Sequence, residues 1–349
     1  MTRRLTLVAL AAGEPMGQQI YEHELTSRAA EQLGSTWDVH RMVVRTVRSP
    51  VAGTVRVPSR VLHGGGAGLR RVTGHLLYRG SDLVHRLDLR LPPAPAPEAL
   101  TILDLAPWRF ADEAPVPDDA AASARRAAAV ICPSQYIADE VTSVLGVRQP
   151  VVIPCGVGRQ FVDARPLDAA DLEALGIRPP FVLHVGGSGS RKNLQGLADA
   201  WRLVGADRPD ITLVLIGPPD RRRDECFLQL SGTRLPGWLP DDTVPRLMAS
   251  AAVLVVPSRY EGFGLPALEG MATGTPVVAA GRAALPEVCG DAAYLVEPDG
   301  PGLAEGIVAA LDGGPETEAM VTRGRKRAAD ATWEAAVAAH ARVWQSLGD

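Results

Sequence analysis

Cysteine pairs, long apolar runs and a strong net charge are all missing from this chain of 349 residues. Its four cysteines, Cys132, Cys155, Cys226 and Cys289, lack the close spacing of a structural zinc site, and we expect reduced thiols in a cytoplasmic protein. No apolar run approaches the ~20 residues that cross a bilayer. The run at 5–10 is too short for a signal peptide, so we expect a strand there.

The net charge of -4 gives no sign of a nucleic-acid partner, but the charge is unevenly placed. Residues 41–90 contain two acids, Asp82 and Asp88, against ten arginines, at positions 41, 45, 48, 56, 60, 70, 71, 79, 86 and 90. This excess of eight positive charges (10 - 2) predicts peripheral contact with anionic lipid headgroups at the inner face of a membrane, or with an acceptor that carries phosphate. The alternative is a solvated surface in an arginine-rich protein.

Short apolar runs alternate with helical patterns along the second half of the chain. The runs end at Gly, Pro or Ser, and they lie at 181–186, 213–217, 253–257 and 276–280. Continuous apolar strands indicate a parallel sheet that is covered by helices on both faces. Ligands of such sheets bind beyond the carboxyl ends of the strands.

The first half of the chain is similar but less regular. We expect a mobile loop over residues 47–69, which are rich in Gly, Val and Arg, and a rigid connector at the proline-rich residues 92–97. The sequence predicts a helix over 18–33 and strands at 5–10, 82–85, 100–103 and 129–132.

A strand, a glycine-rich loop and a helix over residues 253–269 place two carboxylates near one another. Pro266 predicts the first helical position, so Glu261 lies in the loop and Glu269 about one turn into the helix. The free amides of residues 262–265, with the helix dipole, favour an anion there. Anion-binding amides beside two carboxylates suit a ligand with phosphates and hydroxyls, such as a nucleotide-sugar. The alternative is an ordinary turn with two surface glutamates.

A second glycine-rich strand end, over residues 184–194, delivers two adjacent cations, Arg191 and Lys192. Charge-assisted hydrogen bonds from such a pair stabilise a diphosphate, both as bound ligand and as leaving group. A basic surface turn is the alternative.

The sequence Glu-Gly-Phe-Gly-Leu-Pro-x-x-Glu at 261–269, followed by Met-Ala-Thr-Gly-Thr-Pro-Val-Val at 271–278, resembles the Glu-x7-Glu signature of the family-4 retaining glycosyltransferases (glycosyl transferases group 1). Arg-Lys-Asn at 191–193 is similar to a mannosyl- and rhamnosyltransferase branch. The resemblance implies the α/β GT-B fold, in which two Rossmann-like domains face each other across a cleft. It places an N-terminal, acceptor-side domain at 1–157 and a nucleotide-sugar-binding domain at 158–332. Residues 158–180 would be a linker, and a last helix, 333–347, would pack back on the first domain.

The resemblance also implies roles for individual residues. Glu269 would accept hydrogen bonds from both ribose hydroxyls, which suits the two oxygens of a carboxylate. Glu261 would bind the donor sugar and oppose positive charge at C1, and Ser258 would assist unless it is a local cap. The donor would also be bound by Gly262, Phe263, Gly264 and Leu265 through the backbone, by Trp238 and Leu239 beside the base, and by Gly17 in the N-terminal domain. The alternatives are a plain loop with a buried tryptophan at Trp238, and a simple strand–helix turn at Gly17.

Leu103 departs from the family, because many relatives have His-Asp where this chain has Leu103-Asp104. Leucine neither donates a hydrogen bond nor carries charge, so the contact that the histidine makes with the donor sugar needs another residue, or activity is low. His85 ends the preceding strand and is the candidate substitute, with a structural role as its alternative. Asp104 remains a candidate on the acceptor side.

These patterns together predict a retaining glycosyltransferase that moves a hexose from a nucleotide-diphospho-sugar to a hydroxyl of a glycan, lipid-linked or small-molecule acceptor. GDP-mannose is the favoured donor, with UDP- or dTDP-sugars as alternatives, and we expect no metal or other cofactor. A weak or inactive homologue that binds a nucleotide-sugar or a partner protein is one rival. A nucleotide-sugar epimerase or a glycogen-type phosphorylase is another, although the residues that either reaction needs cannot be placed in the sequence.

Overall fold

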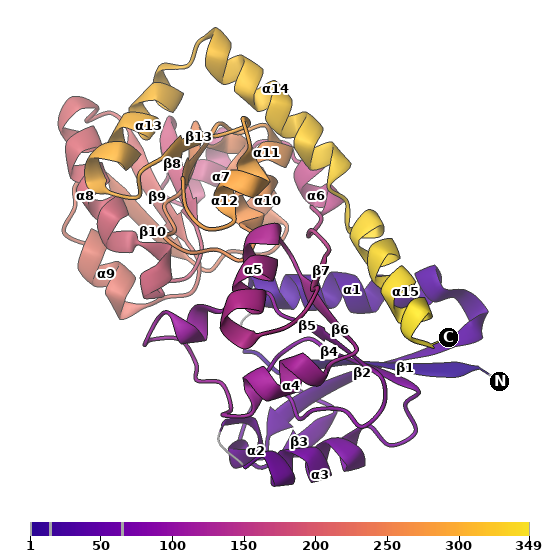
Figure 1. The fold of residues 1–349 in the computed structure, drawn as a ribbon. Helices are drawn as coiled ribbons and strands as arrows, with labels where there is room; N and C mark the ends of the chain where they lie inside the picture. Colours follow the sequence, from indigo (N-terminus) through magenta and orange to yellow (C-terminus); the bar gives the residue numbers. More distant parts are fainter. Residues whose placement is uncertain (1, 14–15, 64–65, 349) are drawn as a thin grey trace. The chain divides into compact units, whose positions relative to one another are not determined.

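The computed structural model describes residues 2–13, 16–63 and 66–348. They form two compact units, an N-terminal unit of residues 1–155 and 333–349 and a C-terminal unit of residues 156–332. The boundary between the units falls after residue 155, two residues before the boundary predicted after residue 157. Each unit is built on a parallel β-sheet whose successive strands are mostly joined through helices (Figure 1), which is how a chain returns to start the next parallel strand.

The N-terminal sheet has seven strands in the order β3-β2-β1-β4-β5-β6-β7. The interior strand β1 pairs with β2 and β4, and its Leu5, Leu7 and Val8 side chains are fully buried. Strands predicted near residues 5–10, 82–85 and 129–132 are confirmed. The seven are β1 (Arg3–Leu10), β2 (Trp37–Thr46), β3 (Val55–Val57), β4 (Leu83–Arg86), β5 (Glu98–Thr101), β6 (Ala129–Cys132) and β7 (Val151–Val152).

The mobile loop expected at 47–69 is wrong, because this segment contains β3, the helix α2 (Ser59–His63) and the start of the helix α3 (Ala67–Leu77). The sequence also failed to predict β2, because much of this ten-residue strand is only half-buried and therefore lacks a continuous apolar run. The helix predicted over 18–33 is confirmed as α1 (Gly17–Leu33). The other helices of this unit are α2 (Ser59–His63), α3 (Ala67–Leu77), α4 (Ala120–Arg126), α5 (Gln135–Glu140) with a π-helical turn (Val141–Leu145), and α15 (Trp333–Gly348).

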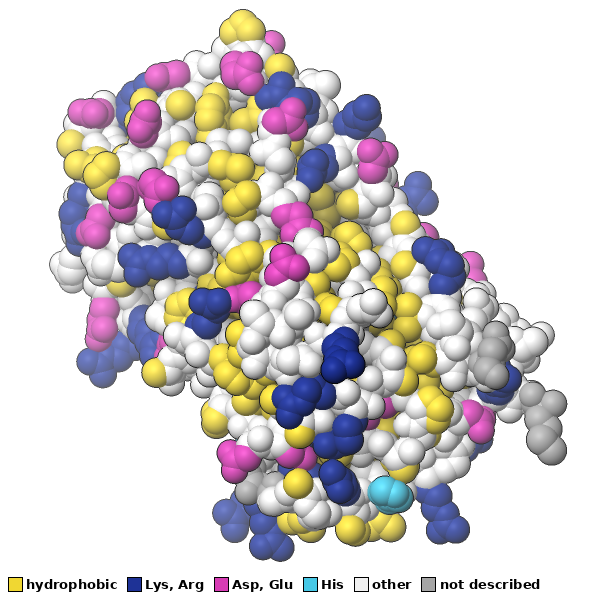
Figure 2. Space-filling model, viewed as in Figure 1, with side chains coloured by type: hydrophobic (Ala, Val, Ile, Leu, Met, Phe, Trp, Pro, Cys, Tyr) yellow, Lys and Arg dark blue, Asp and Glu magenta, His cyan; other side chains and the backbone are white. Residues whose placement is uncertain are grey.

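Two arginines of region 41–90 are fully buried in ion pairs with buried acids. Arg70 donates to Asp119 at 2.8 Å, and Arg86 donates to Glu98 at 2.5 Å. The second pair explains why the start of β5 was predicted at residue 100 and not at Glu98. A glutamate is usually exposed to solvent, but the ion pair with Arg86 allows Glu98 to be buried in the strand. The surface excess of eight charges was therefore too high. The Lys and Arg side chains visible on one face are dark blue in Figure 2.

The C-terminal sheet has six strands in the order β10-β9-β8-β11-β12-β13. All four strands predicted in this half are confirmed, with each boundary within one residue. The strands are β8 (Phe181–Val185), β9 (Thr212–Ile216), β10 (Thr233–Gly237), β11 (Val253–Val256), β12 (Val277–Ala280) and β13 (Tyr294–Val296). The helices are α6 (Arg159–Val162), α7 (Ala169–Ala174), α8 (Leu194–Asp207), α9 (Arg221–Phe227), α10 (Thr243–Ser250), α11 (Leu265–Thr273), α12 (Leu285–Cys289), α13 (Gly300–Asp312) and α14 (Pro315–Asp330).

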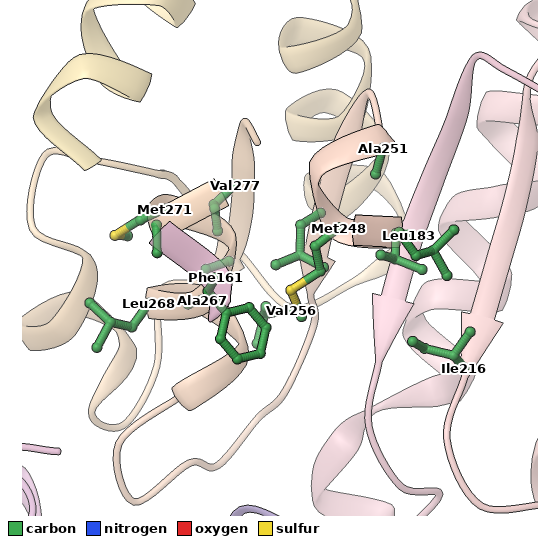
Figure 3. Packing of buried hydrophobic residues seen from close by; sticks show 14 of the residues in the cluster. Phe161, Leu183, Ile216, Met248, Ala251, Val256, Ala267, Leu268, Met271 and Val277 are labelled. Carbon is green, nitrogen blue, oxygen red and sulfur yellow. The ribbon is translucent and has the colours of Figure 1, made fainter. Parts of the chain in front are cut away.

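The linker expected at 158–180 is wrong in its character, because this segment is part of the packed core. It forms α6 and α7, and Phe161, Leu167, Leu172 and Ile177 are buried in the apolar cluster of the C-terminal unit. Figure 3 shows Phe161 within that cluster, among residues of α11. The prolines of this segment, Pro166, Pro179 and Pro180, lie outside both helices.

Within the described residues, none of the helices has the combination of length and apolar character that spanning a membrane requires.

Candidate functional site

The loop between β11 and α11 has a glycine that no other residue can easily replace. Gly264 caps α11 with φ at +102°, and a Cβ atom there would lie 2.6 Å from the Leu285 side chain. Positive φ and this close approach both favour glycine. The helix begins at Leu265, one residue before the predicted start, so Pro266 occupies its second position. Glu269 still lies about one turn into the helix.

Glu261 lies in this loop as a buried carboxylate that contacts both predicted cations. The Lys192 ammonium donates to Glu261 Oε1 at 2.6 Å, and the Arg191 guanidinium donates to Oε2 at 3.3 Å. Burial by itself would raise the pKa of Glu261, but Lys192 and then Arg191 outweigh that effect and hold the pKa at about 2. Glu261 is therefore ionised across the physiological pH range.

Asn193 fixes the loop after β8 against the loop after β11. It has a left-handed backbone with φ at 57°, and its side-chain amide donates to the Pro257 carbonyl at 3.0 Å and the Pro298 carbonyl at 2.8 Å. The backbone N–H of Arg259 donates to the Arg191 carbonyl at 2.9 Å. The carboxyl ends of two neighbouring strands, β8 and β11, thus present Arg191, Lys192 and Glu261 together.

Glu269 is buried in a different way. Its side chain is only 7% exposed, and among the residues that the structure describes none donates a hydrogen bond to its carboxylate. Burial raises its pKa to about 7. A buried acid without donors is an unfilled acceptor, and two hydroxyl groups of a ligand would satisfy it.

The other residues predicted to bind the donor are distributed between the two units. Ser258 is buried in the loop two residues after β11, and Gly262, Phe263 and Leu265 belong to the same loop and the helix start. Leu239 is 8% exposed but Trp238 is 39% exposed, so the alternative of a buried tryptophan is wrong. Gly17 and Asp104 belong to the N-terminal unit, where Gly17 begins α1 and Asp104 accepts from the Ala106 backbone N–H at 3.0 Å.

Sequence reasoning missed two buried residues near the loop that follows β8. Arg223 of α9 donates to the Gly186 carbonyl, and its charge-rich neighbourhood in the sequence gives no sign of burial. His184 of β8 contacts the Val255 carbonyl through Nδ1 at 3.1 Å, and its Nε2 has no partner among the described residues. Burial lowers the pKa of His184 to about 4, so the ring is neutral. Neither residue carries a pattern that would have revealed it.

His85 has a structural role, and its candidacy as a catalytic substitute is wrong. The ring is fully buried in the N-terminal unit, where it contacts the Thr101 hydroxyl at 2.8 Å and accepts from the Trp344 indole at 3.1 Å. It stacks on His340 of α15 with ring centroids 5.8 Å apart. Burial first, and then the neighbouring His340, lowers its pKa well below the usual value.

In the part of the chain that the structure describes, no three His, Cys, Asp or Glu side chains converge as metal ligands. The expectation that the reaction needs no metal stays a prediction.

The comparison with protein families identifies the C-terminal unit. Residues 179–313 match the family described as Glycosyl transferases group 1. The C-terminal unit belongs to this family. The C-terminal unit contains the Glu-x7-Glu segment and the Arg191-Lys192 pair, and the resemblance drawn from those residues is confirmed.

Curated relatives match part of the chain. O-antigen chain mannosyltransferase B of Escherichia coli is 37% identical over 164 residues, which cover 44% of this chain and 42% of the relative. The first of these relatives are matched over less than two thirds of their own length.

Solved structures are similar over nearly the whole chain. Sucrose-phosphate synthase from Thermosynechococcus elongatus has a TM-score of 0.76 at 23% identity, over 99% of each chain. The Anabaena protein HepE, solved with UDP and glucose, has a TM-score of 0.74 at 18% identity, over 98% of this chain and 99% of the other. These likenesses confirm the GT-B fold with its two Rossmann-like units.

Proposed function

We propose that this protein is a retaining glycosyltransferase that moves a hexose from a nucleotide-diphospho-sugar to an acceptor hydroxyl. One observation carries the proposal: a buried carboxylate without donors, Glu269, shares a loop–helix segment with the ionised Glu261, which two cations contact. A ligand with a vicinal diol and a diphosphate satisfies all four side chains. The family membership of the C-terminal unit supports the same reaction.

In the proposed complex, Glu269 accepts hydrogen bonds from the ribose hydroxyls, and Arg191 and Lys192 bind the diphosphate. The N-terminus of α11 adds amides and a favourable dipole. Glu261 binds the sugar and opposes the positive charge that develops at C1 as the diphosphate departs. The acceptor attacks from the face that the diphosphate leaves, and a donor phosphate oxygen takes the acceptor proton. This route retains the configuration at C1 without a covalent intermediate.

GDP-mannose is the favoured donor. The Arg-Lys-Asn sequence supports it, and so does the similarity to a relative named as a mannosyltransferase. HepE, which is similar in fold, was solved with UDP and glucose, so a UDP-sugar is the first alternative and a dTDP-sugar the second. The backbone near Trp238 and Leu239 would read the base, and Gly17 of the N-terminal unit would also approach the donor. The acceptor would use the N-terminal unit through Asp104.

The lysines offer a matched pair of variants for testing the proposal, because Lys192 and Lys326 are the only lysines in the chain. Lys192 is buried in the pair with Glu261, whereas Lys326 is exposed on α14. Release of the nucleoside diphosphate from GDP-, UDP- and dTDP-sugars would be measured for wild type, Lys192→Gln, Glu261→Gln and Lys326→Gln. Removing one charge stabiliser typically lowers kcat by about 10²- to 10³-fold, so the first two variants should lose turnover and the third should keep it. Unchanged turnover in Lys192→Gln and Glu261→Gln would refute the assignment.

A binding protein without transferase activity is the second candidate, and Leu103 favours it. His85, the residue that would have compensated for Leu103, is buried in a structural cluster. Such a protein would bind the nucleotide-sugar in calorimetry and release no diphosphate, with or without acceptor. Nothing in the site favours an epimerase. A cytoplasmic location stays a prediction, as does membrane contact through region 41–90, because neither follows from the donor site.

A further inference from the structure

The outward face of α3 is apolar at three positions. Leu69, Val72 and Leu76 are 42%, 59% and 73% exposed. Their spacing of three and four residues places them along one side of the helix. The opposite side, with Arg70 and Gly74, faces the interior of the N-terminal unit. α3 therefore has an inner face that is already packed and an outer apolar stripe that is not.

The chain around this stripe is basic and has no acids. Residues 39–81 contain eight arginines and three histidines but neither Asp nor Glu. The structure removes Arg70 from the surface by burying it against Asp119, and it half-buries Arg45. Six exposed arginines remain, and no ion pair between them and another described residue is formed. They are Arg41, Arg48, Arg56, Arg60, Arg71 and Arg79.

The stripe and the nearby arginines together define what we call the α3 surface: Leu69, Val72 and Leu76 with Arg56, Arg60, Arg71 and Arg79. In Figure 2, dark blue side chains surround hydrophobic ones at the end of the N-terminal unit where Figure 1 shows α2 and α3. A surface that serves only for solubility would mix both signs of charge and keep its large apolar side chains apart.

A shallow hollow at the end of α3 adds hydrogen-bond donors beside this surface. It is lined by Arg79 with Arg4, His40, Thr6, Thr54 and Ser81, among others. Asp38 contacts both Arg4 and His40 there, so the charge of Arg4 is partly neutralised, whereas Arg79 has no such partner among the described residues. The hollow thus offers Arg79 and hydroxyl groups to an anion the size of a phosphate.

We propose that the α3 surface binds the surface of an anionic lipid bilayer, with α3 lying in the interface plane. Leu69, Val72 and Leu76 would enter the boundary between headgroups and acyl chains, and the arginines would contact lipid phosphates. Charge complementarity selects this occupant, because an anionic bilayer offers negative charge and an apolar layer side by side over the whole stripe. A neutral protein partner would match the stripe and leave the arginines unpaired, and an acidic peptide would do the reverse.

The test is co-sedimentation of the full chain with phosphatidylcholine vesicles that contain phosphatidylglycerol, and with vesicles of phosphatidylcholine alone. We expect binding to the anionic vesicles only, and weaker binding as salt increases. Arg71→Gln and Arg79→Gln should each lower the partition coefficient about fivefold, and the pair Val72→Ser and Leu76→Ser should lower it by about tenfold or more.

Two surface variants of the C-terminal unit serve as matched controls. Leu228→Ser removes an equally exposed leucine, 63% accessible, and Arg221→Gln removes an arginine whose side chain is 90% accessible. Both should bind vesicles as wild type does. Because every substituted side chain is exposed, thermal unfolding should be unchanged in all variants, and diphosphate release in detergent-free buffer should be unchanged as well.

Three results would overturn the proposal. The first is equal binding of all variants to anionic vesicles. The second is capture by polyglutamate as strong as by vesicles, with loss in the arginine variants but not in the leucine and valine pair, which would identify an acidic polypeptide as the partner. The third is a dimer in sedimentation velocity that the Val72 and Leu76 changes dissociate, which would assign the stripe to a second copy of this chain.

Discussion

Glu269 allows the proposed donor site to be tested by pH alone. Its carboxyl group is buried, lacks hydrogen-bond donors among the described residues, and has a pKa of about 7. The ionised form offers two charged acceptor oxygens to the ribose hydroxyls and binds them more strongly than the neutral acid does. If that contact forms, nucleotide affinity must follow the ionised fraction of this one group, and Glu269→Gln must remove the dependence.

The size of the effect follows from the pKa. With a pKa near 7, about one molecule in eleven is ionised at pH 6 and about ten in eleven at pH 8. The dissociation constant for GDP or UDP should therefore fall about tenfold between these pH values, with a midpoint near pH 7. The terminal phosphate of the nucleotide also titrates near pH 6, but it does so equally in both proteins. The ratio of variant to wild-type affinity isolates Glu269.

The same group predicts an opposite effect on the stability of the unliganded protein. Its pKa is raised on folding from 4.5, so the unfolded chain ionises first and the folded state loses stability as pH rises from about 4.5 to about 7. Relative to wild type, Glu269→Gln should be more stable, by about 1 kcal/mol more at pH 8 than at pH 6. Nucleotide should stabilise wild type at pH 8 and the variant much less.

Isothermal titration calorimetry at pH 6, 7 and 8, with urea denaturation of the same samples, measures both quantities. A variant-to-wild-type affinity ratio that stays constant across this range would refute the role of Glu269 in ribose binding. A Glu269→Gln protein that is less stable than wild type at pH 8 would refute the burial argument itself.

Three further predictions concern the fold that supports the site. His340 is buried and its pKa is lowered to about 4, so below about pH 6.5 the unfolded state binds more protons than the folded state. The free energy of unfolding should therefore decrease by about 2 kcal/mol as the pH is lowered from 7.5 to 5. Urea denaturation of His340→Gln should show a weaker dependence on pH, and an equally steep one would contradict this. Phe161→Ala should cost about 3–5 kcal/mol of unfolding free energy, as expected for a core residue, whereas a linker residue would cost almost nothing. Gly264→Ala should lower both thermal stability and nucleotide affinity, because its backbone and Leu285 both oppose a Cβ; the exposed Gly68→Ala, in α3, is the control and should lower neither.

The parts of the protein that the sequence predicts well are those in which neighbouring residues act together. Arg191 and Lys192 are adjacent, and Glu261 and Glu269 share one loop–helix segment, so each half of the site is a local pattern. The strands of the C-terminal sheet are buried on both faces, so their apolar runs are continuous. The site motifs and the apolar runs can both be recognised without knowing which segments of the chain contact one another.

Four of the failures involve a partner in another segment of the chain. Glu98 lies in a buried strand only because Arg86 neutralises it, and Arg223 is buried only because the Gly186 carbonyl accepts from it. His85 looked available for chemistry because Trp344, more than 250 positions away, cannot be paired with it from sequence. Phe161 lies in a core that α11 completes later in the chain. Local propensity contains none of these long-range contacts.

The position of α15 has a consequence for how the protein is made. The C-terminal unit is one continuous segment of chain, so its synthesis is complete at residue 332, before α15 is made. The N-terminal unit is made of two segments, and the second contains α15. His340 and Trp344 of this helix contact the first segment: the Tyr21 hydroxyl lies 2.7 Å from His340, and His85 accepts a hydrogen bond from Trp344. Until the ribosome delivers that helix, these buried polar groups lack their partners. The unit whose synthesis begins first therefore receives its last helix only after the whole of the other unit has been translated.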